Sequence, residues 1–182
     1  MPKQAVFIQG STDINVCRIN DALEQLQNES TNCAGAFRFT DLNLPKKSTF
    51  LDGLKEYLLQ IEQYQKPYLD YNGTKMYVRQ YDPNNLRLVK MDNLETYIQG
   101  RLTYWSNFPN PCYRSTVTEK YEQHENALKS ILFNFLNEQE VINAYLVKDF
   151  DLCYIVGTDS MVDDILIETQ KGVYVLHLGF TL

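Results

Sequence analysis

Six carboxylates and no basic side chain fall within 22 consecutive residues near the C-terminus, from Asp149 to Gln170. Of the 23 acidic residues in the chain, the other 17 match the 17 lysines and arginines, so this segment carries the whole formal charge of −6. Clustered carboxylates can bind a divalent cation, and they can attract a basic protein over a long range. The six residues are Asp149, Asp151, Asp159, Asp163, Asp164 and Glu168.

Metal binding would require two or three of these carboxylates to converge on one ion, as in a metal-dependent hydrolase or nuclease. The candidates for such a site are Asp159, Asp163, Asp164 and Glu168. Nucleases commonly carry Glu-x-Lys after an Asp on a strand, but here Glu168 and Lys171 are one residue too far apart and would point to opposite faces. A calcium loop needs alternating oxygen ligands and a glycine, which are missing between Asp159 and Asp163. Metal-dependent hydrolysis is therefore the alternative hypothesis, and no metal or cofactor is predicted.

An electrostatic binding surface is the first hypothesis for the acidic segment. Clustered carboxylates raise the rate of encounter with a basic partner by roughly ten- to a thousand-fold at low salt. A second explanation stays open beside it, because charges that border apolar strands also discourage aggregation between sheet edges. Under either explanation the carboxylates are expected on the protein surface.

Other residues with reactive side chains lack the neighbours that their chemistry requires. Cys112 lies twelve residues before His124, and no local signature marks it as a nucleophile. Gly10, Ser11 and Thr12 form a strand-to-helix turn, but the turn lacks the several glycines of a phosphate-binding loop. We therefore predict a non-enzymatic protein.

An aromatic segment with two prolines, from Leu102 to Tyr113, supplies a further candidate contact surface. It contains the single tryptophan of the chain, Trp105. Proline removes backbone donors and biases the preceding residue away from helix, so the segment is predicted to be irregular. Exposed, Trp105 would be an anchor for a partner, because Trp and Tyr dominate the energetics of protein contacts. Buried, the segment would be a lid on the core.

The elements that position these residues follow from the hydrophobic periodicity. Apolar residues at spacings of three and four predict helices over 11–26, 49–65, 92–98 and 117–137, with Gly100 ending or weakening the third. Strands are predicted at 5–8, 36–39, 75–80, 86–90, 151–157, 165–169 and 173–180. We expect 75–80 to form a hairpin with 86–90, and the last two strands to form a C-terminal hairpin. Residues 141–147 either finish the last helix or begin a strand.

The faces of the last strand are predicted from its alternation. Tyr174, Leu176, Leu178 and Phe180 share one face, which we expect to be the core, and this leaves His177 on the other. Residues 158–164 are predicted as a polar loop, with Asp163 and Asp164 directly before the next strand.

Length and composition favour a single α+β domain over residues 1–182, with a mixed or antiparallel sheet, a C-terminal strand hairpin and three to four helices. A chain of 182 residues, 44% of them hydrophobic, can bury about two-thirds of its unfolded surface. The start of the chain lacks the apolar core of a signal peptide, and no apolar run is long enough to span a bilayer. The four cysteines show no C-x-x-C spacing, so we expect reduced thiols in a cytoplasmic protein. The acidic balance argues against nucleic acid as a partner.

A small acidic α+β protein that is rich in Asn, Gln and Tyr and lacks a catalytic motif resembles the bacterial immunity proteins that neutralise contact-delivered toxins. The resemblance covers the whole chain in overall style, and no functional residue is carried over from it. It implies a one-to-one complex with a basic toxin domain, often a nuclease, whose active site is covered. We therefore predict an inhibitor that binds a basic toxin or nuclease domain, with no membrane association, through the six carboxylates and Trp105.

Overall fold

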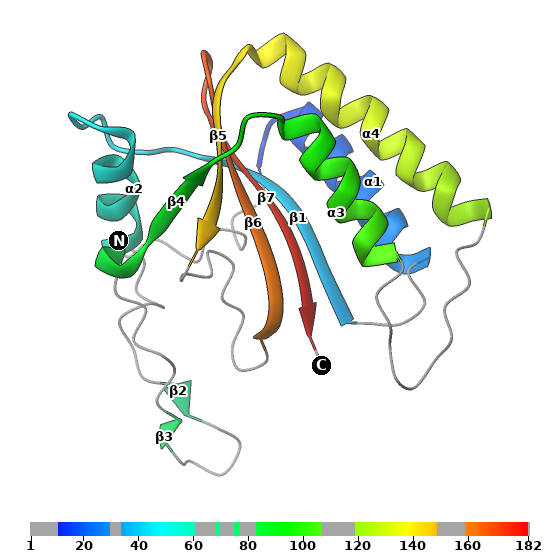
Figure 1. The fold of residues 1–182 in the computed structure, drawn as a ribbon, viewed down its shortest axis with the longest axis horizontal. Helices are drawn as coiled ribbons and strands as arrows, with labels where there is room; N and C mark the ends of the chain where they lie inside the picture. Colours follow the sequence, from blue (N-terminus) through cyan, green and yellow to red (C-terminus); the bar gives the residue numbers. More distant parts are fainter. Residues whose placement is uncertain are drawn as a thin grey trace.

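A five-stranded antiparallel sheet with helices on both faces forms the centre of the molecule (Figure 1). The computed structural model describes residues 11–29, 34–60, 68–69, 75–76, 83–106, 119–148 and 159–181. The strands follow the order β1-β7-β6-β5-β4 across the sheet, with every pair antiparallel. Their bounds are β1 Ala34–Leu42, β4 Arg87–Lys90, β5 Val141–Lys148, β6 Asp159–Thr169 and β7 Val173–Thr181. The predicted α+β class is thus confirmed.

Besides the central sheet, the described residues form a two-stranded sheet, one 3-10 turn and four α-helices. β2 (Tyr68–Leu69) and β3 (Lys75–Met76) pair with each other in a separate two-stranded sheet, and a 3-10 turn spans Pro83–Asn85. The helices are α1 (Ile14–Glu29), α2 (Phe50–Leu59), α3 (Leu94–Ser106) and α4 (Glu119–Gln139). No helix in these ranges is both long and apolar enough to cross a membrane.

The larger core lies between the sheet and α1, α3 and α4, which cover one face (Figure 1). We call this face of the sheet the helix-layer face. The apolar stripe of α1 (Val16, Ile19, Leu23 and Leu26) is fully buried there, as its three- and four-residue spacing predicts. Phe39 of β1 stacks on Tyr174 of β7 with ring centroids 5.5 Å apart, and Phe135 of α4 meets both rings edge-on.

A second core covers the opposite face of the sheet, which we call the α2 face. Leu54 and Leu58 of α2 pack there on Val175 of β7 and Leu166 of β6. Helix α2 begins at a capping pair, where the Thr49 hydroxyl donates to the Asp52 carboxylate and accepts from the Asp52 amide. The alternation of the last strand predicted only one of its faces to be core. The structure buries both faces, because helices lie on both sides of the sheet.

Four further predictions are resolved by the strand pairing. The polar loop expected at 158–164 is wrong from Asp159 onwards, since β6 begins there. The expected hairpin between 75–80 and 86–90 is also wrong, because β3 pairs with β2, and β4 pairs with β5. Residues 141–148 form a strand, and the C-terminal hairpin is confirmed as β6 and β7. Strands expected at 5–8 and 151–157 lie outside the described residues.

Helix α3 is longer than expected. It continues through Gly100 to Ser106, so the segment predicted as irregular from Leu102 onwards begins as helix. Ile98 and Leu102, one turn apart, are both fully buried in the larger core. Burial of these two side chains stabilises the helix and outweighs the unfavourable propensity of one glycine. The rest of the segment, 107–113, lies outside the described residues.

Candidate functional site

The predicted contact residues fall into three groups. Asp149 and Asp151 lie outside the described residues. Trp105 belongs to α3 and Asp159 to the first position of β6, but their side chains lie outside what the structure describes. The remaining three, Asp163, Asp164 and Glu168, lie within β6 with described side chains.

Asp163 lies on the helix-layer face, where it pairs with Arg101 of α3. The guanidinium donates from Nε to Asp163 Oδ2 over 2.6 Å, and Nη2 pairs with the same oxygen. Arg101 also lies over the Tyr104 ring, with Cζ 4.3 Å from the ring centroid. Asp163 is only 7% exposed, so its charge is largely directed into this contact and away from solvent.

The pKa of Tyr97, which also lies on α3, depends on this ion pair. Burial raises the pKa of the Tyr97 hydroxyl most, the negative charge of Asp163 raises it further, and the positive charge of Arg101 lowers it. Asp163 is therefore part of an electrostatic network inside the fold, between β6 and α3.

Asp164 lies on the α2 face of the sheet, where it pairs with His177 of β7. The two residues are direct partners in the antiparallel register, and Nδ1 of the imidazole lies 2.7 Å from Oδ1 of the carboxylate. The exposed fractions are 1% for Asp164 and 4% for His177. Such a pair can orient an imidazole as a general base, but a substrate would need access to the ring. At this burial the pair acts within the fold.

Gly179 makes room for the imidazole. It lies two residues beyond His177 on β7 and therefore on the same face of the sheet. A methyl group at Gly179 would lie 3.0 Å from Cε1 of His177 and would overlap Nε2. The ring thus occupies the space that any other residue at position 179 would fill with its side chain.

Of the four carboxylates considered for a metal site, the three whose side chains the structure describes do not converge. Asp163 and Asp164 are neighbours on one strand and point to opposite faces, so they cannot share an ion. Glu168 lies on the Asp164 side, four residues further along, and accepts a hydrogen bond of 2.8 Å from Asn143 Nδ2. Within the described ranges, no three His, Cys, Asp or Glu side chains are placed to hold a metal ion.

Exposed negative charge gathers instead on the helical layer. Residues 11–29, 94–106 and 119–140, which form α1, α3, α4 and their ends, contain ten acidic and four basic residues. One of those bases, Arg101, pairs with Asp163 of the sheet, and Lys129 pairs with the buried Glu125. The acidic surface in the described part of the chain therefore lies on the helices, while Asp163 and Asp164 of β6 face inward.

Large apolar side chains are exposed at the end of the molecule where α1 begins and α4 turns into β5. Three of the five such side chains in the described residues lie there: Ile14 at 69% exposed, Ile142 at 48%, and Val141. Exposed carboxylates accompany them, namely Asp13, Glu138 and Glu140. We call these six residues the α1–β5 end.

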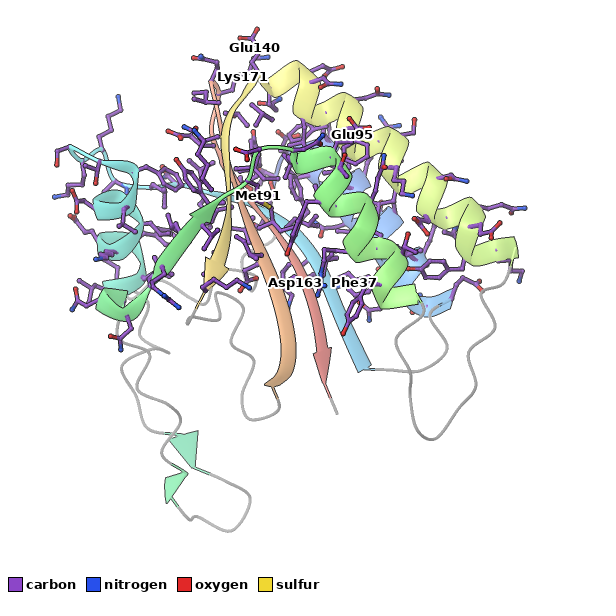
Figure 2. All side chains as sticks on the ribbon, in the orientation of Figure 1. Phe37, Met91, Glu95, Glu140, Asp163 and Lys171 are labelled. Atoms are coloured by element: carbon purple, nitrogen blue, oxygen red, sulfur yellow. The ribbon has the colours of Figure 1, made fainter. Side chains whose placement is uncertain are left out.

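Contacts through Tyr174 connect the two segments of the α1–β5 end. The Tyr174 hydroxyl donates to Gln139 Oε1 over 3.1 Å, at the last residue of α4. Burial raises the pKa of Tyr174 most, and the charge of Asp13 raises it next, which places Asp13 within electrostatic reach of the same hydroxyl. Figure 1 shows the start of α1 at this end of the sheet, and Figure 2 labels Glu140 and Lys171 at its tip.

The α1–β5 end was missed by the sequence analysis, although one signal pointed to it. Ile14 falls outside the buried stripe of α1, and an apolar residue outside the stripe is expected to face solvent. Val141 and Ile142 gave no such signal, because a short apolar run reads equally well as a buried strand. Of the other reactive residues, His124 is half-buried on α4, and Cys112 lies outside the described residues.

Comparisons with known proteins add no relative. No protein-family model matches the chain, and neither curated proteins nor solved structures gave a match. The fold and the geometry of the described residues are therefore the basis for a functional proposal.

Proposed function

We propose that this chain is a non-enzymatic protein-binding module that inhibits a basic partner, such as a toxin or nuclease domain, in the bacterial cytoplasm. The observation that carries the proposal is the α1–β5 end, where Ile14, Val141 and Ile142 are exposed beside three carboxylates. Apolar anchors within a charged rim are the usual composition of a protein contact surface.

The charge of the helical layer supports a basic partner. An excess of six carboxylates over bases in α1, α3, α4 and their ends gives this side of the molecule a negative field. Such a field speeds the encounter with a positively charged protein, and the apolar anchors then slow dissociation. A nuclease domain that contacts phosphate groups through basic side chains fits this requirement.

The inward orientation of Asp163 and Asp164 changes which residues we assign to the interface. Both side chains are almost fully buried and already paired, so a partner would have to open the fold to reach them. Glu168 is half-buried and lies near the α1–β5 end, opposite Asn143. It is the one described carboxylate of the predicted set that remains a candidate rim residue.

Affinity capture from the native cell tests the proposal when it uses matched variants. Ile14→Asp/Ile142→Asp removes two anchors, whereas Leu59→Asp and Val89→Asp change equally exposed apolar residues elsewhere on the surface. We expect one basic protein that is retained by the wild type and both controls and is lost with the double variant. The purified partner should be inhibited at one-to-one stoichiometry. A partner lost equally with Leu59→Asp, or retained by the double variant, would contradict the assignment.

A further inference from the structure

In the ranges that the structure describes, no strand pairs with the outer edge of β4. β4 is the last strand in the sheet order, with β5 as its neighbour. The Met91 amide donates to the Ala144 carbonyl over 2.9 Å, so in an antiparallel ladder Val89 and Arg87 also direct their backbone groups towards β5. Leu88 and Lys90 must then direct their N–H and C=O groups outward, and in the described part of the chain these groups meet no other strand.

The side chains along this edge are basic and apolar. Residues 83–91 contain two bases, Arg87 and Lys90, and no acid. Both are exposed, and by alternation they lie on opposite faces of β4. Between them, Val89 is exposed to 50%, and Lys148 lies opposite Arg87 on β5 and is exposed as well. Positive charge therefore flanks the open backbone groups on both faces of the strand.

The charges decide which occupant fits the edge. A second copy of this chain is disfavoured, because antiparallel pairing of Leu88 with Lys90 would set the Lys90 side chains of the two copies at diagonal positions on one face. An acidic segment is favoured, because its carboxylates would meet these bases while its backbone continues the ladder. The edge is also distinct from the acidic α1–β5 end, which calls for a partner of opposite charge.

We propose that the β4 edge binds an extended acidic segment of another protein by strand addition. The N–H and C=O groups of Leu88 and Lys90 form the new ladder. Arg87 and Lys90 contact carboxylates of the added strand on either face, and Val89 contacts an apolar residue between them. This is a second interaction surface, and it does not depend on the inhibitor proposal.

A blocked hexapeptide, Thr-Glu-Val-Val-Glu-Thr, is the probe that tests this inference. Its palindromic centre places glutamates opposite positions 87 and 90 in either strand direction. In NMR titration of the full-length protein, we expect saturable binding, with slowed hydrogen exchange at the Leu88 and Lys90 amides. The variant Lys90→Glu/Lys148→Glu should weaken binding about tenfold or more. The matched control Lys120→Glu, on the exposed surface of α4, should leave binding unchanged.

Two altered peptides keep the test independent of protein variants that fail to fold. Methylation of the four central peptide nitrogens removes the backbone donors but keeps every charge, and it should abolish binding. Replacement of both glutamates by lysine should do the same. Equal binding of either altered peptide, no saturable binding of the parent peptide, or a dimer joined at β4 would overturn the inference. The Ile14→Asp/Ile142→Asp variant should bind the peptide like the wild type, so failure here is separable from failure of the inhibitor proposal.

Discussion

Asp164 and His177 face each other across the β6–β7 ladder, with Nδ1 of the imidazole 2.7 Å from Oδ1 of the carboxylate. Both side chains are almost fully buried. A carboxylate so deeply buried is costly unless it is hydrogen-bonded, so this contact lowers the cost of directing Asp164 inward. The pair therefore explains why part of the most acidic segment of the chain lies inside the fold.

Removal of the Asp164 carboxylate should destabilise the protein. We expect Asp164→Ala to lower the free energy of unfolding by about 1–3 kcal/mol, because the buried imidazole loses this acceptor. Asp164→Asn should cost less, since its amide oxygen can still accept from Nδ1–H. Urea unfolding followed by circular dichroism measures both. The control Asp21→Ala, at an exposed position of α1, should stay within about 0.5 kcal/mol of the wild type. Two Asp164 variants as stable as the control would refute the role given to the pair.

Substitution of Gly179 should be harmful only while the His177 ring is present. Gly179→Ala overlaps Nε2 of an imidazole that Asp164 holds in place, and overpacking of this kind costs about 1–3 kcal/mol. In a His177→Ala background the same change should be nearly neutral or stabilising, because alanine suits a strand better than glycine. A double-mutant cycle of unfolding free energies measures the difference. Additive effects of the two substitutions would show that the ring does not occupy this space.

The ion pair beside Tyr97 should control the pKa of that tyrosine in two directions. Asp163→Asn removes a negative charge and should lower the Tyr97 pKa, whereas Arg101→Gln removes a positive charge and should raise it. Both changes should be smaller than the effect of burial, which is the main cause of the raised pKa. NMR of 13C-labelled tyrosine follows the titration residue by residue. Shifts of the same sign in both variants would contradict the geometry.

Stability should fall at alkaline pH. The pKa values of Tyr57, Tyr97, Tyr145 and Tyr174 are all raised in the folded protein, with burial as the first cause. Folding then favours the protonated hydroxyls, so their contribution is fully present below the unfolded value of about 10 and is lost as pH rises through the folded values. The unfolding free energy can be measured from about pH 8 to about pH 11, a range that brackets the ordinary tyrosine pKa. It should decline only in the upper part of this range. An unfolding free energy that stays constant over the whole pH range would contradict the raised pKa values of these tyrosines.

The helices could be predicted from the sequence because their buried stripes repeat at three and four residues. α1, α2 and α4 all contain such stripes within the predicted ranges. The strands were less predictable, since a short apolar run such as 141–147 fits a buried strand and a helix end equally well. Gly100 was a misleading signal, because the buried Ile98 and Leu102 hold the helix through it.

The candidate site was harder to predict because it depends on pairing between distant residues. The acidic segment does carry the excess negative charge, but the number of its carboxylates does not show which of them are buried. Asp163 pairs with Arg101, which lies 62 positions earlier in the chain, and Asp164 pairs with His177, which lies 13 positions later. Both contacts require the strand register and the placement of α3, which local patterns do not encode. The exposed carboxylates on the helices were visible in the sequence but appeared balanced by bases elsewhere.

Binding of the captured basic protein to wild type and variants, measured by isothermal titration calorimetry, tests the central claim most directly. We predict one-to-one binding with loss of the partner's activity, and at least about tenfold weaker affinity for Ile142→Asp, a cost of about 1.4 kcal/mol, than for Leu59→Asp. Binding of the partner to the wild type should also weaken at high salt, because the acidic helices attract the basic partner during the encounter. Equal affinities of the two variants, or a partner that remains fully active in the complex, would contradict the account.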